Sequence, residues 1–354
     1  MKRKVKVAYV GVGIEGSLIV RYSIQHGAEP VAAFGHSAKT VGQDLGLLAG
    51  VGALGIPVSH VNDIRSVFAA VKPDICIVAA RGTLAEIEDV LIACAQCGVN
   101  CINIGEEATW PWTTNPSLAD KLDKLAKENN CTLTSSGCPE IGWGTIVSCA
   151  MGACARVDSV RIKSTLNLED YGVLYLYENH HVGYRLEDWN EQFGGKVFEG
   201  ENGHIPCFPG DQNSWMCDYL GLTPTRQICT HVPILSNKDV YSKNLDRVIP
   251  VGCLIGEAMV ISTETAEGIT VEYELACKIY TEGDSEHYEY IIRGEPETTV
   301  IHWMSPVTPI ITAATPVNRI PDVINARPGY VTSSEFPRNR YLARPLNEYV
   351  LKDE

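Results

Sequence analysis

Two adjacent glutamates, Glu106 and Glu107, are the residues of this sequence best suited to acid–base chemistry. They follow the apolar run 101–104, which we predict to be a buried strand, and Trp110 and Trp112 come shortly after them. Aromatic side chains beside a carboxyl group desolvate it and raise its pKa toward neutrality, where general bases work efficiently. We predict that one glutamate is catalytic, with Glu107 preferred because it lies nearer the tryptophans, and that Trp110 contributes to an apolar substrate wall. A glutamate-rich start of a helix is the alternative.

A second chemical signal is the spacing G-x-G-x-x-G, formed by Gly11, Gly13 and Gly16. It follows the apolar run 5–10 and opens a helical pattern at Ile14. Gly11 permits a tight turn, Gly13 lets the backbone approach a pyrophosphate, and Gly16 lets the helix pack closely on the strand. The free N–H groups and positive dipole end of the helix, beginning at Ile14, then bind the phosphates. The motif predicts a dinucleotide site; an ordinary glycine-rich turn is the alternative.

The end of the second predicted strand, residues 31–34, is where a dinucleotide site distinguishes NAD from NADP. An NAD-specific site usually places an acidic residue there to hold the ribose 2′-hydroxyl group, but none precedes Asp44. The missing charge would also have repelled a 2′-phosphate. We therefore expect His36, Ser37 and Lys39 to bind that phosphate. These residues favour NADP(H), or the use of both cofactors, over NAD(H) alone. A solvated loop is the alternative.

Ala80 and Arg81 end a further apolar run that begins at residue 74. Cofactors lie at the carboxyl edge of the strands in open α/β sheets. We therefore predict that Ala80 and Arg81 contact the cofactor, although Arg81 can also be an exposed loop arginine.

The elements that position these residues alternate between strand and helix through residues 1–135, which predicts an α/β fold with a doubly wound parallel sheet of the Rossmann type. Residues 254–303 are typical of successive antiparallel strands, residues 168–250 show little periodicity, and residues 306–326 are predicted to be helical despite their prolines. The expected organisation has three parts: an NAD(P)-binding Rossmann domain (1–140), a substrate-binding and oligomerisation α+β domain with an antiparallel sheet (141–303), and a C-terminal helix and tail that return to the Rossmann domain (304–354).

Composition excludes several classes of protein. A chain of 354 residues suits about two domains. The net charge of −14 argues against a nucleic-acid partner, because an acidic surface repels phosphate backbones. Every stretch of 18 residues contains charges or breakers, which argues against a membrane span. An odd count of thirteen cysteines in a chain of this size favours reduced thiols, and hence the cytoplasm.

The spacing of Cys94, Cys97 and Cys101 invites a metal-site interpretation. Cys94, however, falls on the apolar side of a predicted helix, three or four residues from Val90, Leu91 and Cys97. A second cluster of cysteine and histidine with ligand spacing does not accompany it. We therefore predict that no metal is bound.

Several of these motifs resemble the 2,4-diaminopentanoate dehydrogenases and related native amine dehydrogenases of the dihydrodipicolinate reductase-like superfamily. The similar segments are residues 42–46, the run ending at Ala80, residues 105–107 with 110–112, and residues 317–330. The resemblance implies NAD(P)-dependent oxidative deamination, reversible as reductive amination, of an amine or diamino acid such as 2,4-diaminopentanoate. Glu107 or Glu106 would then activate the water that hydrolyses the iminium and bind the cationic nitrogen. The resemblance also implies a homo-oligomer, a dimer or tetramer, built through the antiparallel sheet.

The middle of the chain departs from that family pattern. Residues 137–143 stand where the family tends to show an Asn-Pro-Gly type turn, and Trp143 in this segment is expected to contact the substrate. Residues 178–185 are similar to the paired-histidine motif of dihydrodipicolinate reductases, but the basic residue comes one position late. His181 is therefore a further substrate candidate, and a hydrogen-bonded structural pair of His180 and His181 is the alternative.

Three other functions remain open at this point. The paired histidines favour a cyclic-imine reductase close to dihydrodipicolinate reductase. A sugar or cyclitol dehydrogenase would be expected to place a lysine where this sequence has two glutamates. A non-catalytic NAD(P)-binding sensor would retain the glycines without needing the glutamates.

Overall fold

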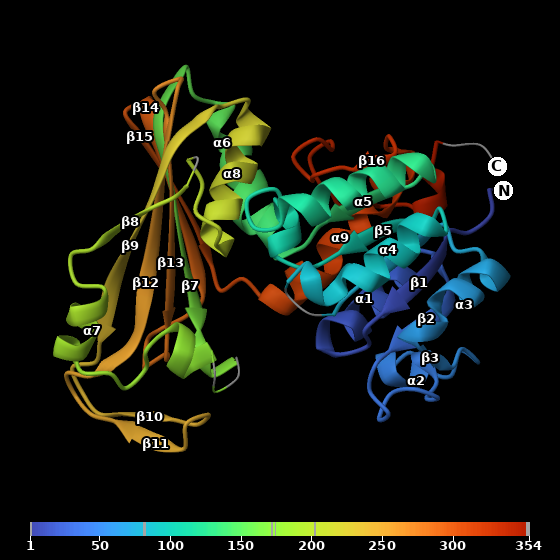
Figure 1. Cartoon of the computed structure of the whole chain (residues 1–354), viewed down its shortest axis with the longest axis horizontal. Helices are drawn as coiled ribbons and strands as arrows, with labels where there is room; N and C mark the ends of the chain where they lie inside the picture. The colour runs from blue at the N-terminus through green and yellow to red at the C-terminus, as the bar shows by residue number, and fades with distance from the viewer. Residues whose placement is uncertain (1, 81–82, 171–172, 174, 202, 352–354) are drawn as a thin grey trace. The chain divides into compact units, whose positions relative to one another are not determined.

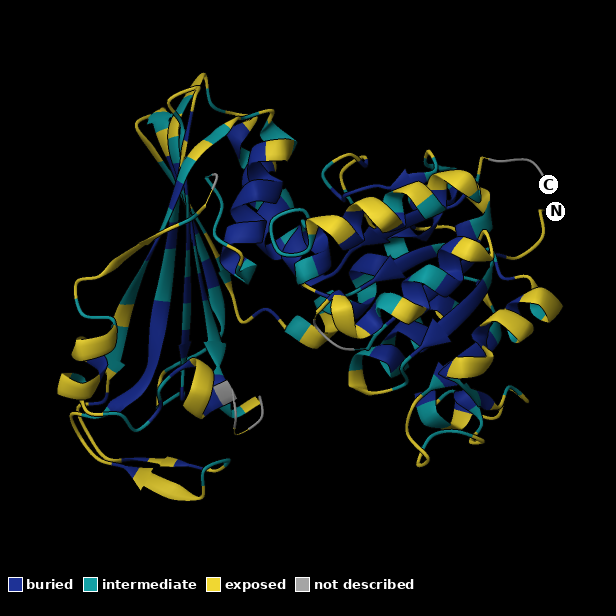
Figure 2. Cartoon of the chain, viewed as in Figure 1, coloured by how far each residue is buried: buried dark blue, intermediate teal, exposed yellow. Residues whose placement is uncertain are grey.

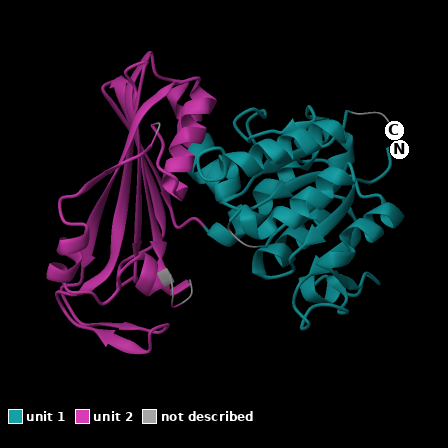
Figure 3. Cartoon of the chain, viewed as in Figure 1, with its two compact units in different colours: residues 1–145, 307–354 teal, residues 146–306 magenta. Residues whose placement is uncertain are grey.

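The computed structural model describes residues 2–80, 83–170, 173, 175–201 and 203–351. The chain divides into two compact units (Figure 3). Unit 1 comprises residues 1–145 and 307–354, and unit 2 comprises residues 146–306. The chain therefore leaves unit 1 once and returns to it. Within the part of the chain that the structure describes, no helix is both long and apolar enough to cross a membrane.

Unit 1 is built on a parallel sheet with the strand order β16-β6-β5-β4-β1-β2-β3. Its strands are β1 (Lys6–Val10), β2 (Glu29–Gly35), β3 (Val58–His60), β4 (Ile75–Val78), β5 (Asn100–Asn103), β6 (Thr132–Ser135) and β16 (Gly329–Tyr330). Its helices are α1 (Ile14–Gln25), α2 (Leu45–Ala49), α3 (Ile64–Val71), α4 (Glu88–Gln96), α5 (Pro116–Glu128) and α9 (Thr308–Asn325).

Both faces of this sheet are covered, which explains why its strands read as continuous apolar runs. Phe68 of α3, Cys94 of α4 and Leu122 of α5 belong to the apolar cluster on one face. Ile19 of α1 and Ile320 of α9 belong to the cluster on the other. Figure 1 shows α9 beside α1, and Figure 2 shows the strands of unit 1 in the buried colour over most of their length.

Unit 2 contains a mixed sheet with the strand order β15-β14-β7-β13-β12-β9-β8 and a separate hairpin of β10 and β11. Its strands are β7 (Arg156–Asn167), β8 (Val197–Glu199), β9 (Pro224–Leu235), β10 (Val240–Ser242), β11 (Arg247–Ile249), β12 (Leu254–Thr265), β13 (Thr270–Lys278), β14 (His287–Glu295) and β15 (Thr298–Met304). Its helices are α6 (Ile146–Met151), α7 (Leu186–Gln192) and α8 (Phe208–Leu220).

The structure confirms the predicted fold class, a Rossmann unit joined to an α+β unit, with one correction. The sequence predicted that strands 254–303 follow one another as antiparallel neighbours, and this is wrong between β13 and β14. β7 lies between them, parallel to β13 and antiparallel to β14. A local pattern of alternation gives the face of each strand but carries no information on which distant strand inserts beside it.

Candidate active site

The glycine turn between β1 and α1 has the shape that a dinucleotide needs. A Cβ on Gly11, where φ is +85°, would lie 2.3 Å from the carbonyl oxygen of Ala79, and one on Gly16 would lie 2.1 Å from that of Gly11. Both positions therefore require glycine for the turn and helix to pack. A Cβ on Gly13, in contrast, would meet no heavy atom within 4 Å. The backbone at Gly13 is thus open to a ligand.

The start of α1 supplies donors at the same place. Gly13 is the N-cap residue and offers no side-chain cap, and the first helical hydrogen bond there runs from Ser17 N–H to the Gly13 carbonyl. The N–H groups of the first turn of a helix have no helical acceptor of their own. Ile14, the first residue of the helix, is 74% exposed. These features fit the phosphates of a dinucleotide, which bind at helix N-termini.

The loop after β2 leaves His36, Ser37 and Lys39 exposed. The nearest acidic residue, Asp44, is engaged elsewhere: its carboxylate accepts backbone N–H groups at the start of α2 and from residues 54–56, at 2.7–3.2 Å. The hydrogen bond from Leu54 is the main cause that lowers the pKa of Asp44. Asp44 therefore caps a helix and a loop and does not supply an acidic group at the end of β2.

The predicted cofactor residues after β4 lie close to the glycine turn. The Cβ of Ala80 is 3.3 Å from the position that a Cβ on Gly11 would take. Arg81, the other residue predicted here, lies outside the described residues. Gly11, Gly13, Gly16 and Ala80 therefore lie at one edge of the sheet.

The two glutamates follow β5 at this carboxyl edge of the sheet. Gly105, which precedes them, is held on both sides: its N–H donates to Asn103 Oδ1 at 3.0 Å, and its carbonyl accepts from Ser135 Oγ at 2.8 Å. Glu106 is the N-cap of a single 3-10 turn, Glu107–Thr109. The chain thus leaves the buried strand through a tightly bonded turn, which we call the acidic turn (residues 105–108).

The side chains of the two glutamates have different surroundings. Glu107 is half-buried, and its Oε2 accepts the N–H of Leu84 at 2.5 Å. Glu106 is accessible to solvent, while the protein around it desolvates its carboxyl group and raises its pKa to about 7. A carboxyl group that is accessible and titrates near neutrality can exchange protons with a ligand. These contacts favour Glu106 over Glu107, the reverse of the preference drawn from the sequence.

The tryptophans after the acidic turn pack together. The rings of Trp110 and Trp112 lie 5.3 Å apart, and Trp112 meets the ring of Tyr330 edge-on at 5.5 Å. Trp112 Nε1 also donates to Asp120 of α5 at 3.3 Å. Trp112 therefore contacts aromatic rings on two sides, and Trp110 lies at the end of this aromatic group; both side chains are half-buried.

Trp143, a predicted substrate contact, is only 3% exposed and lies in the helical segment Pro139–Thr145. The same segment carries Glu140, which pairs with the buried Arg319 of α9 and accepts from Ser136 Oγ at 2.6 Å. Arg319 is further held by Asp322 at 2.8 Å. This ion pair joins the end of the first half of unit 1 to its returning helix.

His181 belongs to unit 2, in a cluster around the buried carboxylate of Glu257. The Nδ1 atoms of His181, His231 and His180 lie 3.4, 3.6 and 4.0 Å from Glu257 Oε1. Trp189 Nε1 donates to the other carboxylate oxygen at 2.9 Å. The paired histidines of the sequence therefore meet a carboxylate of their own unit, whereas Glu106 and Glu107 belong to unit 1.

We expect the contribution of this histidine–Glu257 cluster to the free energy of unfolding to be largest near pH 6.5. Burial alone would lower the pKa of His231, but its hydrogen bond with Cys229 and the nearby carboxylate of Glu257 outweigh it and raise the pKa to about 9. This stabilisation is therefore complete below pH 6.5 and lost as the pH rises through 9. Burial lowers the pKa of His180 to about 4, so its contribution is complete above pH 6.5 and lost as the pH falls.

We expect His231→Gln to cost roughly 3–5 kcal/mol at pH 6.5, the usual loss when one partner of a buried pair is removed, and clearly less at pH 10. Thermal unfolding of wild type and variant across this range measures the difference. His302→Gln, at an exposed histidine of β15 whose Nδ1 lies 3.7 Å from Glu289 on the outer sheet face, is compared as a histidine outside this cluster. A difference in Tm between wild type and His231→Gln that stays constant with pH would contradict the proposed ion pair.

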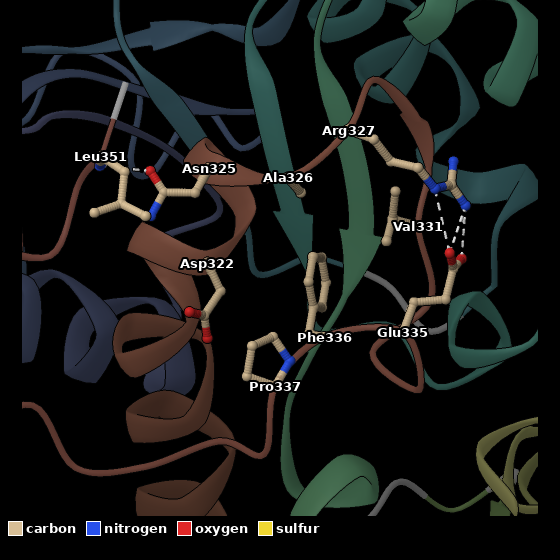
Figure 4. A pocket seen from close by; sticks show the side chains of 9 residues that line it. All are labelled: Asp322, Asn325, Ala326, Arg327, Val331, Glu335, Phe336, Pro337 and Leu351. Atoms are coloured by element: carbon tan, nitrogen blue, oxygen red, sulfur yellow. Dashed lines mark hydrogen bonds and ion pairs between the residues drawn. The ribbon is translucent and has the colours of Figure 1, made fainter. Parts of the chain in front are cut away.

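A pocket of about 440 Å³ lies elsewhere in unit 1, between the end of α9 and the segment that follows it (Figure 4). Arg327 and Glu335 bond to each other at 2.6 Å across it, and Asn325 bonds to the main chain of Tyr349 and Leu351. Its polar groups are thus engaged with one another. The residues that line it are Asp322, Asn325, Ala326, Arg327, Val331, Glu335, Phe336, Pro337 and Leu351. They include none of the residues predicted from the sequence, so we do not place the reaction there.

Three residues that bond to the acidic turn were not predicted from the sequence: Asn103, Ser135 and Tyr330. Asn103 was detectable in principle, because a polar residue inside an otherwise apolar buried strand must find hydrogen-bond partners. It bonds to Gly105 and to the Thr134 carbonyl. Tyr330 reaches the turn from the far end of the chain, and the sequence offers no local signal for such a contact.

Comparisons with known proteins give one consistent result. A model of the 2,4-diaminopentanoate dehydrogenase C-terminal domain matches residues 143–350. The 2,4-diaminopentanoate dehydrogenase of Acetoanaerobium sticklandii is 26% identical over 266 residues, which cover 72% of this chain and 71% of that protein. An amine dehydrogenase structure from Mycobacterium smegmatis superposes with a TM-score of 0.81 at 31% identity, covering 97% of this chain and 98% of the other. A myo-inositol 2-dehydrogenase from Lactobacillus plantarum shares only the fold, with a TM-score of 0.51 and 13% identity over 84% of this chain and 76% of the other.

Proposed function

Because the chain belongs to the 2,4-diaminopentanoate dehydrogenase family, we propose that it catalyses the NAD(P)-dependent oxidative deamination of an amine or diamino acid such as 2,4-diaminopentanoate. The membership confirms the resemblance seen in the sequence and makes the chain an oxidoreductase that acts on amines. The observation that best supports NAD(P)-dependent oxidative deamination is the accessible carboxyl group of Glu106 at the carboxyl edge of a Rossmann sheet, with a pKa of about 7.

The proposed reaction converts an amine, water and oxidised cofactor into a ketone, ammonia and reduced cofactor. When bound, the nicotinamide ring accepts the hydride that leaves the amine-bearing carbon. Glu106 as carboxylate takes a proton from the substrate ammonium group before hydride loss, passes it to solvent, and then pairs again as a carboxylate with the cationic nitrogen of the iminium. It next takes a proton from the water that attacks the iminium carbon and gives that proton to the amine nitrogen, so that the C–N bond breaks, ammonia leaves and the hydroxyl proton is lost to form the ketone. A group with a pKa near the working pH can serve in both directions.

The proposed role of Glu107 is positioning. Its hydrogen bond from Leu84 N–H joins the acidic turn to the segment after β4, which begins at Ala79 and Ala80 beside the glycine turn. Glu107 thus connects the proposed acid–base group to the proposed cofactor site.

For the cofactor, we propose that Gly11, Gly13, Gly16 and the first turn of α1 at Ile14 hold the pyrophosphate and that Ala80 contacts the dinucleotide. The open space at Gly13 and the donors of the helix start support this assignment. His36, Ser37 and Lys39 would hold a 2′-phosphate, because they are exposed at the end of β2 and Asp44 is committed to the start of α2. This favours NADP(H) or dual use.

Replacement of Lys39 by alanine should lower kcat/KM for NADP⁺ about 10–100-fold, since a hydrogen bond to a charged group contributes about 1.5–3 kcal/mol. Ser37→Ala should have a smaller effect in the same direction. The value for NAD⁺ should stay near that of wild type for both variants, and steady-state kinetics with each cofactor measure this. A strong preference for NAD⁺ that neither substitution alters would show that residues 36–39 do not bind the 2′-phosphate of NADP⁺.

We propose further that unit 2 binds substrate and forms a dimer or tetramer in the cytoplasm. One face of its sheet packs on α8, through bonds such as Asn213 Nδ2 to the Val271 carbonyl. The other face carries the ion pairs of Arg161 with Glu272 and of Lys163 with Glu289, next to exposed valines such as Val300. A mixed polar and apolar sheet face of this kind suits contact with a second copy.

A substrate screen separates this function from its rivals. Reduction of NAD⁺ and NADP⁺ is followed with diamines, amino acids and polyols, and cofactor oxidation is followed with cyclic imines. We expect turnover with amines, and its loss in the Glu106→Gln variant. Turnover with polyols alone would instead indicate a cyclitol dehydrogenase, and turnover with cyclic imines alone a reductase. Cofactor binding without any turnover would indicate a sensor.

A further inference from the structure

Tyr330 reaches the acidic turn from the C-terminal part of the chain. It ends β16, which pairs with β6 at the edge of the sheet in unit 1. Its backbone N–H donates to Asp123 of α5 at 3.0 Å, and the next residue, Val331, donates to the Leu133 carbonyl at 2.9 Å. The side chain is 2% exposed. Tyr330 is therefore fixed from both the neighbouring strand and the neighbouring helix.

The hydroxyl group of Tyr330 donates to the carbonyl of Ala108 at 2.6 Å. Ala108 lies in the 3-10 turn that Glu106 begins, and it is 1% exposed. The opposite end of the turn, Gly105, is held by Asn103 and Ser135. Glu106 thus lies between two fixed points, and Tyr330 supplies one of them.

We propose that Tyr330 is a positioning residue for the deamination reaction: its hydroxyl group anchors the acidic turn at Ala108 and so holds the carboxyl group of Glu106 at the carboxyl edge of the sheet. This inference rests on the proposed function, because it requires Glu106 to be the acid–base group.

The chemistry of the phenol supports this role. Burial raises the pKa of Tyr330 well above its usual range, so the hydroxyl group keeps its proton and remains a donor at any working pH. Without it, the buried carbonyl of Ala108 loses its partner, and a buried acceptor without a partner is costly. The turn would then lose its fixed position, the Glu106 carboxyl group would leave the surrounding protein atoms that desolvate it, and its pKa would fall from about 7 toward the ordinary value of 4.5.

The ring of Tyr330 has a second contact that must be separated from the hydroxyl bond. It packs edge-on against Trp112, which in turn packs against Trp110. Tyr330→Phe keeps the ring and removes only the hydroxyl group. Tyr241→Phe is the matched control, because its hydroxyl group bonds to Asp246 on the exposed hairpin of unit 2.

The test measures the pH profile of kcat/KM for the amine in wild type, Tyr330→Phe and Tyr241→Phe. We expect the acidic limb of the profile to move from about pH 7 toward lower pH in Tyr330→Phe, with kcat reduced about 10-fold, since general acid–base catalysis depends on a matched pKa. The cofactor dissociation constant should not change, and Tyr241→Phe should match wild type. Infrared difference spectra against Glu106→Gln follow the same carboxyl group without turnover.

Each outcome decides a separate question. An unchanged profile and an unchanged carboxyl titration in folded Tyr330→Phe overturn the inference. If that variant does not fold, Ser135→Ala, which removes the bond to the Gly105 carbonyl, takes its place and is judged by the same result. If Glu106→Gln itself keeps wild-type activity and pH profile, the proposed function fails, whatever Tyr330→Phe shows.

Discussion

Replacing Glu106 with glutamine is expected to lower kcat/KM for the amine about 10²–10⁴-fold, or about 3–5.5 kcal/mol in the barrier. Glutamine keeps the shape of the side chain but has neither the negative charge nor a basic oxygen. It therefore loses both the proton acceptor and the partner of the cationic nitrogen. Glu106 is the accessible member of the pair and has the raised pKa, so the loss should fall mainly on kcat.

Glu107 supplies the matched control. Its carboxylate accepts one backbone N–H, from Leu84, and a glutamine oxygen can accept the same hydrogen bond. Glu107→Gln should therefore stay within about tenfold of wild type, because a neutral hydrogen bond contributes only about 0.5–1.5 kcal/mol. Glu107→Ala, which cannot accept it, should lose more. The assignment of the two roles is wrong if Glu107→Gln loses activity and Glu106→Gln keeps it.

Gly13→Asp is expected to weaken cofactor binding at least about 100-fold, or about 2.7 kcal/mol, because the carboxylate would stand beside the pyrophosphate. The fold should tolerate the change. A Cβ at this position meets no heavy atom within 4 Å, and φ of −80° is open to any residue. Fluorescence titration with the reduced cofactor measures the dissociation constant, and thermal unfolding without cofactor checks that the protein is folded.

Two alanine variants make this test specific. Gly13→Ala adds only a methyl group and should lose far less affinity than Gly13→Asp. Gly11→Ala should instead destabilise the protein itself, because its Cβ would lie 2.3 Å from the Ala79 carbonyl oxygen at a φ of +85°. Unchanged nucleotide affinity in a folded Gly13→Asp variant would contradict the assignment of the cofactor site.

The sequence allowed much of unit 1 to be predicted, for physical reasons that are local. Residues 75–78 are buried on both faces and therefore form a continuous apolar run. Gly16 is required by its contact with the Gly11 carbonyl in the same βα unit, whereas Gly11 meets the Ala79 carbonyl after β4. The glutamates after β5 could be identified because the carboxyl edge of such a sheet is where ligands bind.

What could not be predicted depends on contacts between distant parts of the chain. The choice between Glu106 and Glu107 depends on Leu84, and the anchoring of the turn depends on Tyr330. The insertion of β7 between β13 and β14 likewise joins segments far apart in the sequence. His181, which we predicted to contact the substrate, lies 3.4 Å from Glu257 of its own unit, and the sequence did not indicate this pairing. Spacing and periodicity carry no record of such pairings.

The most direct test of the account is the stoichiometry of products from 2,4-diaminopentanoate or a related amine. The purified chain is incubated with the amine and NADP⁺ or NAD⁺, and reduced cofactor, ammonia and ketone are each measured. Oxidative deamination predicts one ammonia and one ketone for every reduced cofactor, with none of the three formed by Glu106→Gln above the level of an enzyme-free control. Reduced cofactor without ammonia, or full product formation by that variant, would contradict the function and the acid–base group proposed here.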